Sequence, residues 1–308
     1  MRSLKATLVA CLVASISIGT GAVTSAARVP TSAAPPAAAI RAAAPATPLL
    51  VAVRAASHRH FDRVVWEFLG DVPEVRQAGY VRELRGDPSD LPIRIAGSAI
   101  FELSMTANGH DPDTGTNTSP GRVVAGLGNV IEVVKAGDFE AVLSYGVGLA
   151  KRQPFHVFTL SNPSRVVLDV RKDYRQATRK VWLVDEVRFD AGTPPYTRTV
   201  KRQVPAAAPA AAVLHQLFAG PTPAERARGL QTVRSGATGF TALRISGRVA
   251  KVQLTGGCNS GSTISVADQI IPTLKQFSTV RWVKIYDPSG HTEHPTGRRD
   301  SIPECLEP

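Results

Sequence analysis

The stretch HFDRVVWEFLG, residues 60–70, intersperses apolar and charged side chains in the manner of a half-buried β-strand. The apolar members are Phe61, Val64, Trp66 and Phe68, among Asp62, Arg63 and Glu67. Similar runs follow at 79–84, 93–105, 129–149 and 154–170, separated by Gly, Pro, Asn and Asp. Short alternating strands with frequent turn residues predict an all-β sandwich or barrel, which we place at residues 57–176.

Two polar segments punctuate this predicted β domain. Residues 161–164, SNPS, fit a tight turn between two strands. Residues 106–122 read as a polar loop in which Asp111, Asp113 and Asn117 are close in sequence. A calcium-binding EF-hand loop requires a glycine at its sixth position and a glutamate at its twelfth. The sequence lacks that pattern, so we predict a solvated loop rather than a metal site.

The pattern changes after residue 177. The run 181–189 reads as a strand, and 206–220 as a helix with Val213, Leu214, Leu217 and Phe218 on one face. A hairpin at 240–256 turns at Ser246-Gly247, a second helix occupies 263–277 with Pro272 inside it, and 280–287 forms a last strand. This order predicts a compact α+β domain at residues 177–308, so the fold class is a multidomain chain with an all-β sandwich first.

The start of the chain has the layout of a secretory signal peptide. Arg2 and Lys5 precede an uncharged, small and apolar stretch, and small residues allow cleavage after Ala27. We therefore expect a signal peptide at 1–27 and a secreted, cell-wall-associated protein without a transmembrane segment after cleavage. A transmembrane anchor and a lipid attached to Cys11 are the alternatives. Residues 28–56, rich in Ala and Pro, read as an extended linker.

The stretch LTGGCNSGST, residues 254–263, is the part of the chain that most resembles a reactive or ligand-binding loop. After removal of Cys11, Cys258 and Cys305 remain as an even pair, and an exported compartment favours a disulfide between them. A nucleophilic Cys258 would need a nearby base. His215, His291 and His294 are available, but the sequence ties none of them to it. A zinc site would need the CxxC spacing, which is absent.

The same loop offers two further interpretations. It follows a predicted strand and leads into a helix, so its backbone N–H groups could meet an anion, although it lacks the lysine of a phosphate-binding loop. A helix cap by Ser260, Ser262 or Thr263 is the simpler interpretation. The pairs His58/His60 and His291/His294 lack an indicated third metal ligand. No GxSxG or HExxH signature occurs, so we expect no catalytic residue, metal or cofactor.

Charge is unevenly distributed along a chain of formal net charge +11. Residues 57–176 contain 14 Lys and Arg against 15 Asp and Glu, whereas residues 177–308 contain 17 against 10. For an exported protein the available polyanions are wall polymers, phospholipid head groups and extracellular DNA. Ordinary solubility charge is the alternative explanation. We expect peptidoglycan or an anionic wall polymer as partner, and no specific nucleic acid.

Residues 181–308 resemble the GerMN domain of sporulation and germination proteins. The resemblance rests on VWLV at 181–184, LFAGPT at 217–222, VQL at 252–254, VKIY at 283–286 and the tail SIPEC at 301–305. Residues 58–171 are similar to the AMIN-like domain that precedes GerMN in exported actinobacterial proteins. This similarity rests on FDRVV at 61–65, GDFE at 137–140, GVGL at 146–149 and PSRVVLD at 163–169.

These resemblances imply a β-sandwich and a role at the cell wall. AMIN domains of cell-wall amidases localise the enzyme by binding peptidoglycan, and GerMN domains resemble ring-building folds linked to envelope assembly. No amidase domain follows here, so we expect a non-catalytic, exported peptidoglycan-binding or envelope-assembly protein. The alternatives are a secreted wall-active enzyme or its regulator, and a self-assembling structural protein. The sequence leaves the ligand-binding residues unknown.

Overall fold

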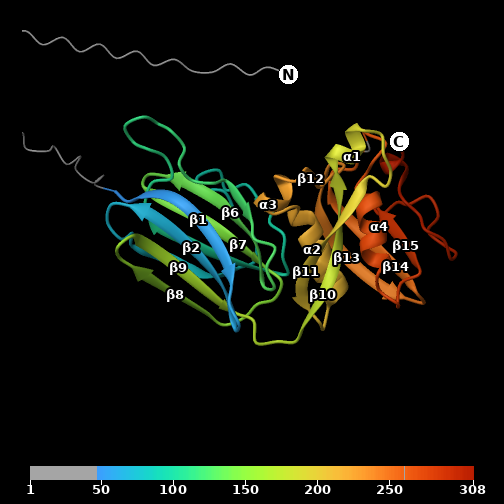
Figure 1. Cartoon of the computed structure of the whole chain (residues 1–308), viewed down its shortest axis with the longest axis horizontal. Coiled ribbons are helices and arrows are strands. Elements are labelled where there is room, and N and C mark those ends of the chain that lie inside the picture. Colours follow the sequence, from blue (N-terminus) through green and yellow to red (C-terminus); the bar gives the residue numbers. More distant parts are fainter. Residues whose placement is uncertain (1–46, 260) are drawn as a thin grey trace, which may run out of the picture. The chain divides into compact units, whose positions relative to one another are not determined.

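Two separate hydrophobic cores organise the computed structural model, which describes residues 47–259 and 261–308. Residues Ala43–Pro308 form a single unit that contains both cores. The first core belongs to a β-sandwich and the second to a mixed α+β domain, as the element labels of Figure 1 show. The signal peptide predicted at 1–27 and residues 28–46 of the predicted linker lie outside the described residues.

The N-terminal domain is a sandwich of two antiparallel sheets, as predicted. One sheet has the order β1 (Leu49–Ser57), β2 (Phe61–Leu69), β9 (Ser164–Arg171) and β8 (Phe155–Leu160). The other has the order β3 (Val75–Val81), β4 (Ala99–Thr106), β7 (Val142–Leu149), β6 (Val130–Phe139) and β5 (Arg122–Val124). The fully buried Trp66, Phe101 and Tyr145 fill the space between the sheets. The predicted turn at 161–164 joins β8 to β9.

Strand β1 corrects the predicted linker, which extended too far at its C-terminal end. Residues 49–56 are not linker, because Leu49–Ser57 pairs along β2. Leu50 is fully buried and Val53 nearly so. The Ala/Pro-rich composition of the preceding residues concealed a short apolar run, LLVAV, of the kind that forms a buried strand.

The segment between β3 and β4 crosses the outer face of the five-stranded sheet. Two glycines of β7 permit this close approach. A Cβ atom at Gly146 would lie 2.4 Å from Leu84 Cδ2, and one at Gly148 would lie 2.1 Å from the carbonyl oxygen of Ala96. The crossing explains why β6 is buried on both faces. It also places Arg94 beside Arg122 of β5, where both lie near the buried Glu132.

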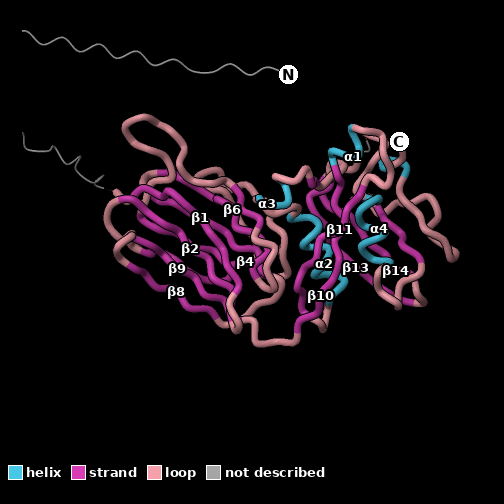
Figure 2. Tube along the Cα trace, in the orientation of Figure 1, coloured by secondary structure: helices cyan, strands magenta, loops and turns pink. Residues whose placement is uncertain are grey.

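The C-terminal domain contains two three-stranded sheets and the helices that pack with them, in agreement with the α+β prediction. The first sheet has the order β11 (Thr197–Pro205), β10 (Gln176–Asp185) and β12 (Leu230–Gln231). In the second, β13 (Ala237–Ser246) is antiparallel to β14 (Val249–Gly256), which is parallel to β15 (Trp282–Tyr286). Helices α2 (Pro209–Ala219) and α4 (Ala267–Lys275) share the core with both sheets (Figure 2).

The strand predicted at 181–189 ends earlier than expected. Asp185 terminates β10 and its side chain accepts a hydrogen bond from the backbone of Arg188, which starts the short helix α1 (Glu186–Asp190). Strand β11 was not predicted. Its sequence TRTVKRQVP buries only Val200, Arg202, Val204 and Pro205, so charged residues obscured the alternation.

The LFAGPT motif ends one helix and begins another. Gly220 adopts φ 93°, a conformation that favours glycine, directly after α2. Thr222 and Glu225 then form a capping box at the start of α3 (Pro223–Arg226). The Glu225 carboxylate also accepts two hydrogen bonds, of 2.6 and 2.5 Å, from the buried guanidinium of Arg202. This pairing anchors the turn to β11.

Helix α2 also contacts the β-sandwich. The Gln216 side-chain amide donates a 2.8 Å hydrogen bond to the carbonyl of Leu127. The backbone N–H of Gly97 donates to His215 Nδ1 at 3.2 Å. Ala219 joins a small apolar cluster with Val124 and Ile131 of the sandwich. The two domains therefore share a polar and apolar junction.

Candidate functional site

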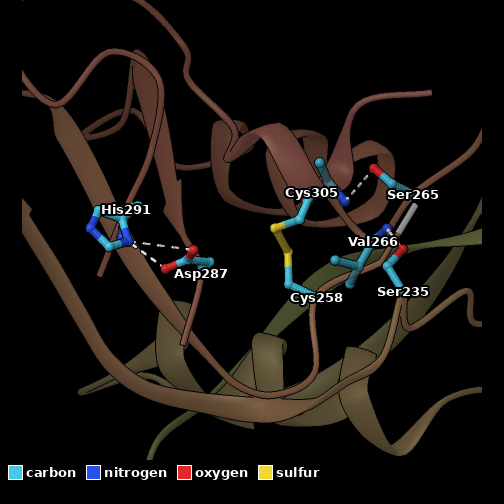
Figure 3. Close-up of a disulfide and its surroundings, with 8 residues drawn as sticks. Ser235, Cys258, Ser265, Val266, Asp287, His291 and Cys305 are labelled. Carbon is cyan, nitrogen blue, oxygen red and sulfur yellow. Dashed lines mark hydrogen bonds and ion pairs between the residues drawn. A yellow bond between two sulfur atoms is a disulfide. The ribbon is translucent and has the colours of Figure 1, made fainter. Parts of the chain in front are cut away.

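Cys258 and Cys305 are joined by a disulfide in the structure (Figure 3). Their Cα atoms are 5.6 Å apart, within the ordinary range for such a bond. Cys258 packs against the core of the C-terminal domain, and Cys305 lies in the short 3₁₀ turn Glu304–Leu306. The bond fastens the C-terminal segment to the loop after β14. In this state neither sulfur is a thiolate nucleophile or a metal ligand.

The loop after the disulfide is occupied by its own side chains. The Val266 N–H donates to Ser235 Oγ at 3.0 Å (Figure 3), and the Ala267 N–H donates to Ser265 Oγ at 3.3 Å. The Ser265 N–H donates to Asp268 Oδ2 at 2.8 Å. The start of α4 is thus satisfied by Ser235, Ser265 and Asp268, which leaves its amide groups little capacity for an external anion.

Neither Ser262 nor Thr263, the two predicted capping residues that the structure describes, accepts a hydrogen bond from the start of α4. Ser262 accepts only from the Ile264 N–H at 3.3 Å, short of the helix start, and Ser260 lies outside the described residues. The sequence named the right kind of interaction. It missed Ser235, which precedes β13 and reaches the helix only through the tertiary fold.

The histidines of the pairs His58/His60 and His291/His294 each lie beside an acidic or aromatic side chain. His60 lies 3.3 Å from Asp173, and His58 stacks on Phe61 with ring centroids 4.6 Å apart. His291 lies beside Asp287 (Figure 3), and His294 Nε2 is 4.0 Å from Glu293. Residues 47–259 and 261–308 contain no group of three or more His, Cys, Asp or Glu side chains arranged to hold a metal ion.

The acidic loop 106–122 is held by local hydrogen bonds. Asp111 Oδ1 accepts from the Asp113 backbone N–H at 2.9 Å, and the Asp111 N–H donates to the carbonyl of Thr116. The hydrogen bond from Asp113 lowers the pKa of the exposed Asp111 carboxyl. The loop thus uses Asp111 for its own turn geometry.

The outer face of the sheet β1-β2-β9-β8 carries a cluster of aromatic and charged side chains. We call Phe61, Arg63, His156, Phe158 and Asp169 the sheet-face site. The register places Arg63 opposite Asp169 and Asp169 opposite His156, while Phe158 lies opposite Val167 in the adjoining row. Because residues two apart on a strand share a face, these side chains lie together in the folded domain.

Arg63 occupies the centre of the sheet-face site. Its guanidinium donates two 2.7 Å hydrogen bonds to the two carboxylate oxygens of Asp169. It also lies 5.2 Å from the ring centroid of Phe61 and 5.4 Å from that of Phe158. The hydrogen bonds to Asp169 raise the pKa of Arg63, although burial opposes them. The two phenylalanine rings and the Arg63–Asp169 ion pair are thus held side by side on one face of the sheet.

A cavity of about 530 Å³ adjoins the sheet-face site. Phe61, His156 and Asp169 line it together with Phe155, Arg171 and Asp173. The hydrogen bond from Arg171 lowers the pKa of the exposed Asp173 carboxyl, so this acceptor is ionised at neutral pH. The lining of the cavity thus combines aromatic rings with hydrogen-bond donors and acceptors. Such a lining suits a ligand that has an apolar face and polar groups along its edge.

The sequence predicted the strands that carry these residues and not the site. Alternation in 60–70 and 154–170 indicates strands, and Phe61 and Arg63 lie in the first of these runs. The pairing of Arg63 with Asp169, 106 residues away, depends on strand register. The spacing of residues within one segment of the sequence does not reveal that register.

Comparison with protein families supports the division seen in the structure. Residues 48–172 match the AMIN-like domain, and residues 180–286 match the Germane (GerMN) domain, described as sporulation and spore germination. No curated protein and no solved structure matches the chain. In the described part of the chain no helix has the length and apolar character needed to cross a membrane. The chain therefore contains an AMIN-like domain followed by a Germane domain, a combination that points to a cell-envelope or sporulation-related role.

Proposed function

We propose that this protein is an exported, non-catalytic component of the cell envelope that binds the glycan strands of peptidoglycan at the sheet-face site. The observation that carries the proposal is Arg63, held by Asp169 and positioned against the rings of Phe61 and Phe158. AMIN-like domains are associated with peptidoglycan binding in general, which supports the same ligand class.

The chemistry of a sugar fits this surface. A pyranose ring presents C–H bonds on its faces, which pack on aromatic rings, and hydroxyl groups at its edge. Among the residues that line the cavity, Arg171 supplies hydrogen-bond donors for such hydroxyl groups, and Asp169 and Asp173 supply acceptors. The exposed ring of His156, stacked 5.1 Å from Phe158, extends the platform. A polymer of sugars can lie along the strands and repeat these contacts.

Sedimentation of the full chain with purified peptidoglycan tests the proposal. Phe61→Ala and Phe158→Ala should each weaken binding about tenfold, or about 1.4 kcal/mol, because each removes one ring that packs on the sugar face. Phe139→Ala is the matched control, because Phe139 is an exposed ring at the end of β6 in the other sheet. Undiminished binding by both site variants, or equal loss in Phe139→Ala, would refute the sheet-face site.

The non-catalytic part of the proposal has its own test. Incubation of the pure protein with peptidoglycan should leave the polymer intact, so release of soluble muropeptides would establish a wall-active enzyme instead. Sedimentation velocity over a range of concentrations addresses the self-assembly alternative. Growth of large species with concentration would favour a structural polymer, and a strict monomer would exclude it.

A further inference from the structure

Four arginine side chains converge on a cavity of about 430 Å³ at the junction of the two domains. Arg94 and Arg122 come from the AMIN-like domain, and Arg226 and Arg234 come from the Germane domain. We call these four residues the arginine pocket. Gln231 and Thr232 add polar side chains to its wall, and no Asp or Glu lines it.

One buried carboxylate offsets only part of this charge. Glu132 is fully buried, ion-paired with Arg122 and 4.0 Å from Arg94. Its Oε1 atom also accepts from the Ala96 N–H at 2.5 Å. Among the described residues, no carboxylate lies within ion-pair distance of Arg226 or Arg234. Four guanidinium groups against one carboxylate leave a surplus of positive charge in a partly desolvated space.

The protein frame holds these cations together. Arg94 and Arg234 both donate 3.1 Å hydrogen bonds to the carbonyl of Phe218, at the C-terminal end of α2. The helix end thus accounts for part of their stabilisation. Arg226 has only a 3.5 Å contact with the Pro221 carbonyl, and Arg234 Nε is buried without a hydrogen-bond partner. The helix end therefore does not explain the whole cluster.

The arginines of the pocket repel one another. Burial, followed by the charges of Arg122 and Arg234, lowers the pKa of Arg94 to about 10, and Glu132 only partly counteracts this. Burial and the charges of Arg122 and Arg226 also lower the pKa of Arg234. An anion placed among these groups would replace repulsion by attraction.

We propose that the arginine pocket binds a phosphate-type oxyanion carried on a larger molecule, such as the phosphodiester of an anionic wall polymer. Planar guanidinium groups hydrogen-bond to phosphate oxygens in pairs, and four of them around one space suit an anion with several acceptors. The cavity is in the range that holds an organic ligand rather than a bare ion. This site is separate from the sheet-face site and does not depend on glycan binding there.

Isothermal titration calorimetry of the chain from residue 28 tests the proposal with three probes at constant ionic strength. The probes are inorganic phosphate, poly(glycerol phosphate) and vesicles containing phosphatidylglycerol. Saturable binding of phosphate or of either phosphodiester source supports the pocket, and the tightest probe identifies the source. Absence of binding to all three overturns the proposal.

Two neighbouring arginines give a matched pair of variants. Arg226→Ala removes a pocket side chain that carries little structural bonding, and should weaken binding about tenfold because it removes charge-assisted hydrogen bonds. Arg228→Ala removes a charge that is also exposed but does not line the pocket, and should leave binding unchanged. Equal weakening in both variants would mean attraction to general surface charge and would overturn the site.

Discussion

At the scale of single residues, Cys258 and Cys305 show how a bond can replace regular structure. They are separated by 47 positions, and the segment after β15 contains only a short 3₁₀ turn. Leu306 is nevertheless buried against the core of the Germane domain. A chain terminus frays unless it is held. The disulfide and Leu306 hold it, together with the backbone hydrogen bonds of Ser301 to Val283 and Ile285 and the packing of Ile302 against the core.

We predict that Cys305→Ser lowers the free energy of unfolding by about 4 kcal/mol, the value that the chain-entropy model gives for a loop of this length. Urea denaturation followed by circular dichroism measures the change. Reductant should destabilise the wild-type chain by a similar amount and leave the variant unaffected. Labelling of two thiols in the unreduced, denatured protein would disprove the bond.

His215 links stability to pH. Burial lowers its pKa to about 4, from about 6.5 in an unfolded chain. Between these values the unfolded chain binds a proton that the folded protein excludes. Stability should therefore decrease as the pH falls from about 6.5 to about 4, by at most about 3 kcal/mol.

The variant His215→Gln isolates this effect, because glutamine does not titrate and its carbonyl can still accept from the Gly97 N–H. Thermal unfolding of both proteins across the pH range gives the comparison. The stability of the variant should depend less on pH in that window. Identical slopes would mean that other groups govern the acid sensitivity.

At the scale of elements, β7 illustrates why a strand can require glycine. Gly148 lies under the segment that crosses the outer face of its sheet. Gly148→Ala should destabilise the protein by about 1–3 kcal/mol, because the added Cβ would overlap a backbone carbonyl that has little room to move. Gly79→Ala in β3 is the control, since no atom lies within 4 Å of its Cβ position. Chemical denaturation of both variants checks the prediction, and equal stabilities would contradict it.

Helix α2 serves two domains at once. Its apolar side chains Val213, Leu214 and Leu217 fill the Germane core, while His215 and Gln216 hydrogen-bond to the AMIN-like domain. Its C-terminal carbonyls accept from Arg94 and Arg234. The helix that the sequence predicts from one apolar face therefore also positions the arginine pocket.

At the scale of the whole molecule, each domain has its own core. We predict that residues 177–308 fold without residues 57–176, because the Germane core includes no side chain from the sandwich. The fragment should be less stable than the same domain in the full chain, because Gln216 and His215 lose their partners.

Denaturation of the isolated fragment by urea measures both points. A single cooperative transition with a lower midpoint is the expected result. A gradual loss of signal without a transition would place the domain boundary elsewhere than residues 174–178. The pairing of β10 with β11 from Gln176 onward supports that position, since a cut there removes only one residue of the strand.

The sequence by itself determined the elements whose pattern is local. Alternation identified most strands of the sandwich, one apolar face identified α2, and two remaining cysteines indicated their pairing. Strand β1 was not predicted because the residues around its start are rich in Ala and Pro. Strand β11 was not predicted because charged residues dominate its exposed face. In β11 the alternation of buried and exposed residues becomes clear only against the neighbouring strand β10, and β1 is recognised by its pairing with β2.

Only the tertiary structure decided which distant residues meet. The sheet-face site joins positions 61–63 to 156–169 through strand register, and the arginine pocket joins positions 94 and 122 to 226 and 234 across two domains. No local spacing records such contacts, because register and domain packing are set by the burial of many side chains together. Charge counts placed a basic surplus in the C-terminal part. The fold brings two arginines of that part, Arg226 and Arg234, together with Arg94 and Arg122 of the AMIN-like domain around one cavity.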